Sequence, residues 1–179
     1  MDLFVVPTGA FQLLYGFIIL RHGRRRIVHF CVTKHPMAIW IAQQITEAFR
    51  WDSVPRYMIR DRDGAYGRAA RERLAVMGIT EVLTAPHSPW QSPYVERVIG
   101  SIRRECLDHV IVLSERHLRR ILASYMNYYH RSRCHLSLDK DTPHGRPAQP
   151  VGSGEIVAFP QVGGLHHRYE RLAACASPG

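Results

Sequence analysis

The sequence predicts an α/β fold built on a mixed five-stranded sheet, with three antiparallel strands, then two parallel strands, and helices on its flanks. Two observations lead to this fold class. Residues 2–33 contain three apolar, strand-like runs separated by turn residues, which is the pattern of antiparallel strands. From residue 36 onward, segments with a helical period alternate with two further short strand-like runs, the order typical of parallel strands.

The first three strands are expected at residues 2–6, 13–20 and 26–33, with a tight turn at 22–24 between the last two. Thr33 is expected to cap a helix over residues 36–49. The last two strands are expected at 56–60 and 79–84, on either side of a helix at 65–77. Gly78 is placed to end that helix as a C′ glycine.

The stretch 88–110, SPWQSPYVERVIGSIRRECLDHV, organises the rest of the chain. Pro93 suits the first turn of a helix, where no backbone N–H is needed. The apolar face of this helix consists of Val95, Ile99, Ile102 and Cys106. Glu96 lies at the edge of that face, and Arg103 follows on the same side. This arrangement suits a metal site beside a polyanion, whereas a solvated glutamate on an amphipathic helix is the simpler interpretation.

Acidic residues are rare in the first part of the chain. Asp2 is the only one before Glu47, so a three-carboxylate site has to begin there. Asp61 and Asp63 follow the fourth predicted strand, and 34 residues separate Asp61 from Glu96. Mg²⁺ prefers carboxylate oxygens, and two such ions about 4 Å apart clamp the attacking and leaving oxygens of a phosphodiester. The alternatives are a DRDG turn whose aspartates cap backbone N–H groups and a glutamate that only stabilises a helix dipole.

These motifs together resemble one family, the DDE integrase and transposase catalytic cores of retroviruses and bacterial insertion sequences (rve-type integrase cores). In that family the second aspartate ends a strand, and an aromatic residue commonly follows five residues later, as Tyr66 follows Asp61. The family's glutamate opens a helix at a spacing similar to that of Glu96. The stretch SPYVERVIGSIRRECLDH looks like this glutamate helix, and the resemblance covers roughly residues 1–150.

The resemblance implies a ribonuclease-H-like fold with a site in which Asp2, Asp61 and Glu96 are catalytic and bind two Mg²⁺ or Mn²⁺ ions. The implied function is DNA integration or transposition, by metal-dependent phosphodiester hydrolysis and strand transfer. Asp61 is preferred to Asp63 because Tyr66 has the family's spacing from it. A ribonuclease-H-like nuclease with another substrate would share this site.

The chain departs from the family's pattern at its start. Only Met1 precedes Asp2, where the family has further strand residues, and the family's upstream DNA-binding helices are absent. The chain is therefore interpreted as an N-terminally truncated core. The alternative function is a catalytically inactive transposase remnant that only binds DNA or an intact partner.

The composition favours a polyanionic partner, and DNA is the expected one. The formal net charge is +9, with 24 Lys+Arg against 15 Asp+Glu, and almost all of the positive charge is arginine. Guanidinium groups suit bidentate phosphate contact, although GC-rich codon usage also enriches arginine. The candidate DNA-binding residues are Arg97, Arg103, Arg104, Arg131 and Arg133. For the last two, a solvated helix end is an equal alternative.

The expected domain organisation is an integrase-like core at 1–138, a proline-rich linker at 139–150 and a basic tail at 151–179. A long helix is expected from its cap at Ser114 to about residue 129, and a short strand at 156–159. No apolar run approaches the roughly 18 residues of a membrane span. We therefore expect a cytoplasmic protein that forms a homo-oligomer on DNA and has no membrane partner.

The remaining candidate ligands and aromatic residues are assigned to packing. The four cysteines form no CxxC motif, and Cys31 and Cys106 are expected in the core. The histidines lack ligand spacing. On a regular strand the adjacent His166 and His167 would point to opposite faces, so they could not jointly bind a metal ion without a loop. Trp40 and Trp90 are expected to pack, although Trp90, in the loop before Glu96, is also placed to touch DNA.

Overall fold

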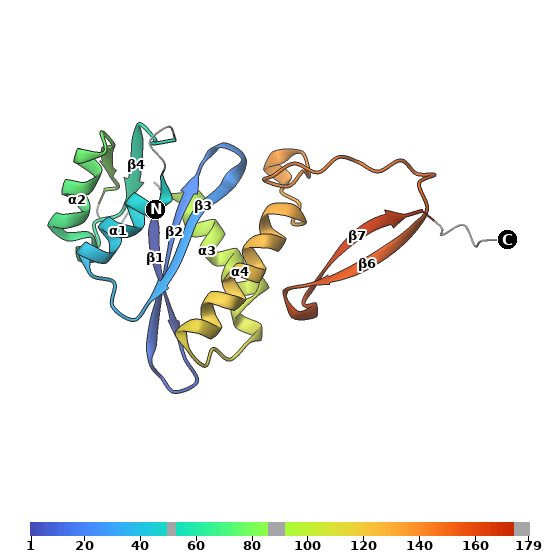
Figure 1. Ribbon diagram of the computed structural model, residues 1–179, viewed down its shortest axis with the longest axis horizontal. Coiled ribbons are helices and arrows are strands. Elements are labelled where there is room, and N and C mark those ends of the chain that lie inside the picture. Colours follow the sequence, from blue (N-terminus) through green and yellow to red (C-terminus); the bar gives the residue numbers. More distant parts are fainter. Residues whose placement is uncertain (50–52, 86–91, 174–179) are drawn as a thin grey trace. The chain divides into compact units, whose positions relative to one another are not determined.

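The structure is a computed structural model that describes residues 1–49, 53–85 and 92–173. The chain forms two compact units, residues 1–119 and 120–179. Figure 1 traces the elements in chain order. The strands and α-helices are β1 Asp2–Pro7, β2 Leu13–Arg21, β3 Arg26–Thr33, α1 Ala38–Ala48, β4 Tyr57–Arg60, α2 Gly67–Val76, β5 Thr80–Leu83, α3 Pro93–Glu105, α4 Glu115–Arg131, β6 Glu155–Gln161 and β7 His166–Leu172.

The first three strands form the antiparallel sheet that the sequence predicts, in the order β1-β2-β3. Asp2 lies opposite Ile18, and the register shifts between Ile19 and Leu20, where β2 pairs with β3. β2 is the central strand, and it is buried along most of its length. Its Gly16 is required by a close approach, because a Cβ there would lie 2.4 Å from the Phe4 ring.

The predicted single five-stranded sheet is wrong: β4 and β5 form a separate parallel pair. The start of β1 is linked to β4 by the Met1 ammonium, which donates a 2.8 Å hydrogen bond to Ile59 O. A ladder needs successive residues side by side, and the described strands β1 and β4 have none paired in this way. The two sheets are joined through this end contact and a shared core.

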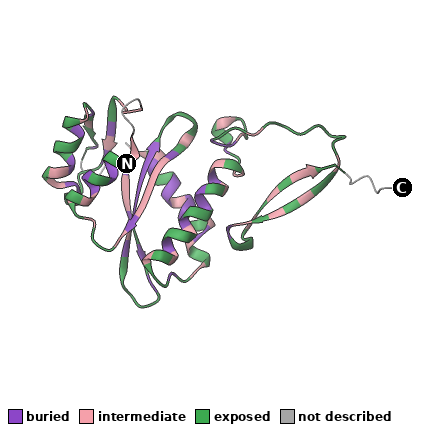
Figure 2. Cartoon of the chain, viewed as in Figure 1, coloured by how far each residue is buried: buried purple, intermediate pink, exposed green. Residues whose placement is uncertain are grey.

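That core lies beside β2 and is closed by α1 and α2, which pack against each other (Figure 2). Alternate residues of β2, Phe17 and Ile19, point into it, and Ile41 and Ile45 of α1 are fully buried against them. The remaining members are Met1, Met58, Tyr66, Ala70, Leu74 and Ile79. Trp40 packs edge-on against Phe17, as predicted.

α3 contacts β1 and β2. Its predicted start at Pro93 and its predicted apolar face are confirmed, since Val95, Ile99, Ile102 and Cys106 are all buried. Burial raises the pKa of the Cys106 thiol to about 11, which suits a core residue. The opposite face is left to polar and charged side chains.

Two helix starts differ from the prediction. Thr33 does not cap α1: its Oγ1 accepts a hydrogen bond from His35 N at 3.0 Å, and the helix begins only after the extended residue Met37. The helix expected at 65–77 begins as a 3-10 turn, η2 (Gly64–Tyr66), because Gly67 adopts a φ of +46° before α2 continues. The predicted end at Gly78 is confirmed by its φ of +72°.

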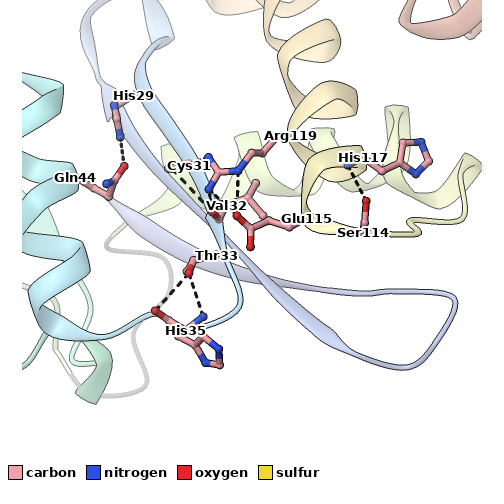
Figure 3. A network of polar contacts seen from close by, with 10 residues as sticks. All are labelled: His29, Cys31, Val32, Thr33, His35, Gln44, Ser114, Glu115, His117 and Arg119. Atoms are coloured by element: carbon pink, nitrogen blue, oxygen red, sulfur yellow. Dashed lines mark hydrogen bonds and ion pairs between the residues drawn. The ribbon is translucent and has the colours of Figure 1, made fainter.

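The start of α4 is tied to β3 by one arginine (Figure 3). Arg119 donates hydrogen bonds to Val32 O, to Cys31 Sγ at 3.1 Å and to Glu115 Oε1 at 2.8 Å. The predicted cap of this helix is confirmed, because His117 N donates to Ser114 Oγ at 3.2 Å. Helix α4 therefore begins at a defined place against the first sheet.

The second unit contains an antiparallel hairpin, β6-β7, whose second strand was not predicted. The His166 ring stacks on Tyr128 with 4.4 Å between centroids, and Arg146 donates to Tyr169 O. His166 is half-buried and His167 exposed, so the two adjacent histidines lie on opposite faces of β7. Across the ranges described above, no helix is long and apolar enough to cross a membrane.

Candidate active site

Asp2 occupies the first position of β1 and is half-buried. Its Oδ1 accepts a 2.8 Å hydrogen bond from the backbone N–H of Leu3. The hydrogen bond from Met1 to Ile59 holds this end of β1 beside the last residues of β4. The fold therefore brings Asp2 near the segment that carries the next two aspartates.

Asp61 and Asp63 are exposed in the loop that follows β4. Asp63 caps η2 by accepting from Ala65 N at 2.8 Å, and Asp61 Oδ1 accepts from Asp63 N at 3.2 Å. The capping alternative raised by the sequence thus describes part of what these side chains do. Asp61 lies directly at the end of the strand, whereas Asp63 is committed to the turn.

Arg60, which was not predicted from the sequence, forms a buried ion pair and holds the backbone of Asp61 in place. Arg60 is almost fully buried; its Nε pairs with Glu81 Oε1 at 2.7 Å, and its Nη1 donates to Asp61 O at 2.6 Å. Its guanidinium also lies 4.8 Å above the centre of the Tyr66 ring. One side chain therefore joins β4 to β5 and holds the backbone of Asp61. The sequence offers one signal for this ion pair: an arginine on one predicted strand and a glutamate on the next, which can lie opposite each other when the strands pair.

Glu96 lies in the first turn of α3 and is exposed. A carboxylate at this position is stabilised by the N-terminal end of the helix dipole. The neighbouring apolar residues Val95 and Val98 are buried, so the helix face toward the core fixes the direction in which Glu96 projects. Residues 88–91, including Trp90, lie outside the described residues.

The charges of Asp61 and Glu96 act on Asp2, after burial as the largest effect. Burial raises the pKa of Asp2 to about 6, the hydrogen bond from Leu3 opposes this rise, and the charges of Asp61 and Glu96 add to it. Burial also lowers the pKa of the Met1 ammonium to about 6, while Asp2 and Asp61 act in the opposite direction. The fold thus gathers negative charge from three elements around one half-buried carboxyl group.

This donor set suits a hard divalent cation. Three carboxylates that repel one another are relieved by a cation, and oxygen ligands are those that Mg²⁺ and Mn²⁺ take. As they stand, however, no three His, Cys, Asp or Glu side chains in the described parts of the chain are grouped closely enough to hold a metal ion. Ion binding at Asp2, Asp61 and Glu96 therefore requires the carboxylates to draw closer together.

The predicted DNA-binding arginines fall on both units. Arg97, Arg103 and Arg104 are exposed on α3, and Arg103 Nη2 donates to Val5 O at 3.2 Å. In the second unit, Arg131 is exposed at the end of α4, and Arg133 is half-buried, 5.9 Å from the centre of the Tyr129 ring. Arg97 and Arg104 therefore share the solvent face of α3 with Glu96, whereas Arg103 also braces the helix against β1.

Comparison with known proteins gives matches in sequence and in fold. Residues 77–143 match the integrase core domain family, a stretch that includes Glu96 and leaves Asp2 and Asp61 outside. The 31.7 kDa protein of insertion element IS407 from Burkholderia multivorans is 26% identical over 106 residues. That alignment covers 59% of this chain and 38% of the relative's length, so this chain spans well under half of it.

Solved integrase structures share the fold. A chain of the simian T-cell lymphotropic virus intasome, solved in complex with PP2A regulatory subunit B56 gamma, matches with a TM-score of 0.64 and 15% identity, covering 94% of this chain and 64% of that chain. The catalytic core domain of BIV integrase matches with a TM-score of 0.51 and 13% identity, covering 79% of this chain and 88% of that one. The chain is therefore similar in sequence to the integrase core domain family over residues 77–143, and it is similar in fold to solved integrase structures.

Proposed function

We propose that this protein carries out metal-dependent phosphodiester hydrolysis and strand transfer on DNA, as a DDE recombinase core. The observation that carries the proposal is the electrostatic coupling of Asp2 with Asp61 and Glu96, which come from β1, the end of β4 and α3. Asp61 and Glu96 also have local roles, in the turn after β4 and in the first turn of α3, but their charges add to the effect of burial on Asp2. A divalent cation would offset this repulsion.

In this proposal Asp2, Asp61 and Glu96 hold two Mg²⁺ or Mn²⁺ ions. When bound, such ions activate the attacking oxygen and stabilise the leaving oxygen of the phosphodiester. Asp2 provides the half-buried ligand and Asp61 an exposed one, with its backbone held by Arg60. Glu96 approaches from the first turn of α3, and its exposure leaves it free to complete the site when DNA arrives.

The proposed substrate is DNA, bound through phosphate contacts. The net charge of +9 and the exposed arginines Arg97, Arg104 and Arg131 support this assignment. Arg103 and Arg133 are proposed as further phosphate contacts. We also propose that the protein acts as a homo-oligomer on DNA, which the likeness to a chain of a viral intasome supports.

The test replaces Glu96 by Gln, which keeps the size of the side chain and removes its charge. We expect E96Q to lose Mg²⁺- or Mn²⁺-dependent nicking and strand transfer on a plasmid carrying the DNA that flanks the gene, and to retain DNA affinity. The matched control is Glu47→Gln, an exposed glutamate of α1, which leaves both properties unchanged. Activity that survives E96Q would remove Glu96 from the site.

A second candidate function is DNA binding without cleavage. It is favoured by the absence, among the described residues, of any three ligand side chains grouped to hold an ion. The same assay separates the two functions. A protein that binds the plasmid tightly but cuts it with neither Mg²⁺ nor Mn²⁺ is a DNA-binding protein that does not catalyse.

A further inference from the structure

Tyr66 carries a buried hydroxyl group that the fold does not use. The residue is only 1% exposed, and its hydroxyl oxygen has no hydrogen-bond partner among the residues that the structure describes. Burying a hydroxyl without a partner costs about 1–3 kcal/mol. Phenylalanine would fill the same space without that cost, so packing explains the ring of Tyr66 and leaves its hydroxyl unexplained.

The hydroxyl belongs to the neighbourhood of the candidate site. Tyr66 ends η2, directly after the loop that carries Asp61 and Asp63, and its ring packs in the same core as Met1, the neighbour of Asp2. Burial raises the pKa of Tyr66 well above its ordinary value, and the charges of Asp2, Asp61 and Asp63 raise it further, while Arg60 opposes them. The hydroxyl therefore stays protonated at neutral pH, and it is available as a donor.

Asp2 offers the matching acceptor. Its Oδ1 already accepts from Leu3 N, whereas no described residue donates to its Oδ2. Asp61 and Asp63 are exposed, and each accepts a hydrogen bond from a backbone N–H of their own loop. Asp2 is half-buried, so of the three aspartates it is the better acceptor for a buried hydroxyl. A carboxylate that binds a metal ion is commonly held by a hydrogen bond from a neighbouring group.

We propose that Tyr66 is a positioning residue whose hydroxyl donates a hydrogen bond to Oδ2 of Asp2 when a divalent cation draws Asp2 and Asp61 together. The inference rests on the proposed function. In the metal-free protein the hydroxyl is an unused donor; in the loaded protein it fixes the orientation of the Asp2 carboxylate. The hydroxyl thus stabilises the loaded site and does not stabilise the empty one.

The test is Tyr66→Phe, with thermal unfolding followed at neutral pH as Mg²⁺ or Mn²⁺ is titrated. We expect metal-free Y66F to melt at or above the temperature of the parent protein, because an unpartnered hydroxyl has been removed. We expect the metal-induced rise in melting temperature to need about ten times more metal in Y66F, the loss typical of a ligand's supporting partner.

The control is Tyr129→Phe, the same change at a buried tyrosine of the second unit, which leaves the metal dependence as it is. A metal titration that is the same for Y66F and the parent protein overturns the inference and leaves the proposed function standing. A clear drop in the metal-free melting temperature of Y66F also overturns it, because the hydroxyl would then stabilise the empty protein. A parent protein that no divalent metal stabilises overturns both the inference and the proposed catalysis.

Discussion

At the scale of single residues, the candidate site stores unfavourable electrostatic energy. Asp2 is half-buried, is acted on by two further acids and has a pKa raised from 3.8 to about 6. A carboxyl group with a raised pKa binds its proton more tightly in the folded state than in the unfolded state. Asp2 therefore makes the metal-free protein less stable as the pH rises from 3.8 to about 6, and its contribution is measured in this pH range.

Asp2→Asn is expected to remove that loss. In chelator-treated protein, the free energy of unfolding of the parent falls across the window by on the order of 2–3 kcal/mol, and D2N shows little of this fall. Urea unfolding at several pH values measures it; values below about pH 6 avoid the range in which the Met1 ammonium titrates between the folded and unfolded states. A parent and a D2N variant with equal slopes would show that Asp2 is not strained.

The sequence led to the acids of the site but not to the groups that support them. Asp2 is predicted by elimination, and Asp61 is preferred to Asp63 because Tyr66 follows it at the spacing of the family that the chain resembles. The contacts of Arg60 with Glu81 and Asp61 depend on β4 lying beside β5, and the unpartnered state of the Tyr66 hydroxyl depends on the whole core. These features arise from tertiary contacts between segments far apart in the sequence, and positions along the chain do not reveal which atoms come together.

At the scale of elements, α3 has two separable faces. Its buried face is apolar, and its exposed face carries Glu96 among arginines with different partners. Arg97 and Arg103 are both exposed, but among the described residues only Arg103 of these two has a hydrogen bond, which it donates to Val5 O of β1. Helix α3 therefore packs against β1 and β2 with one face and presents charged side chains on the other.

Arg97→Gln and Arg103→Gln are expected to behave differently. Loss of Arg97 lowers the salt slope of DNA binding by about 1 and changes stability by less than about 0.5 kcal/mol. Loss of Arg103 also lowers the melting temperature, because the hydrogen bond to β1 is removed. Fluorescence anisotropy with labelled DNA and thermal unfolding measure the two effects. Equal melting temperatures for both variants would contradict a bracing role for Arg103.

The elements themselves were predictable where one periodicity dominates. The alternating runs gave β1, β2 and β3 within one residue of their observed bounds, and the apolar stripe gave α3. β7 was missed because its sequence, HHRYERL, alternates charged and aromatic groups without an apolar face. The division into two sheets was missed because pairing between β1 and β4 depends on where their ends meet, a long-range property.

At the scale of the whole molecule, the dominant property is its charge. A net charge of +9 attracts a polyanion and releases counterions when phosphates are neutralised. Arginines contribute from both units, so neither unit alone accounts for the basic character. Binding to DNA without regard to sequence is the expected baseline on which any recognition of particular ends is built.

We expect DNA affinity to fall steeply with salt. If the five candidate arginines each neutralise one phosphate, the slope of log affinity against log salt is about −4.5, and a fourfold increase in salt weakens binding about 500-fold. Titration of the protein against duplexes of unrelated sequence at several salt concentrations measures this slope. A shallow slope would contradict a surface dominated by phosphate contacts.

The end contact between Met1 and Ile59 makes the spacing of the first two acids adjustable. In a continuous ladder that spacing would be set by strand geometry at about 4.8 Å, whatever the side chains around it. Here it is set by how Met1, Met58 and Tyr66 fill the core between the two sheets. Under the proposed function, core substitutions would therefore change the ion affinity of the site gradually, through the spacing of Asp2 and Asp61.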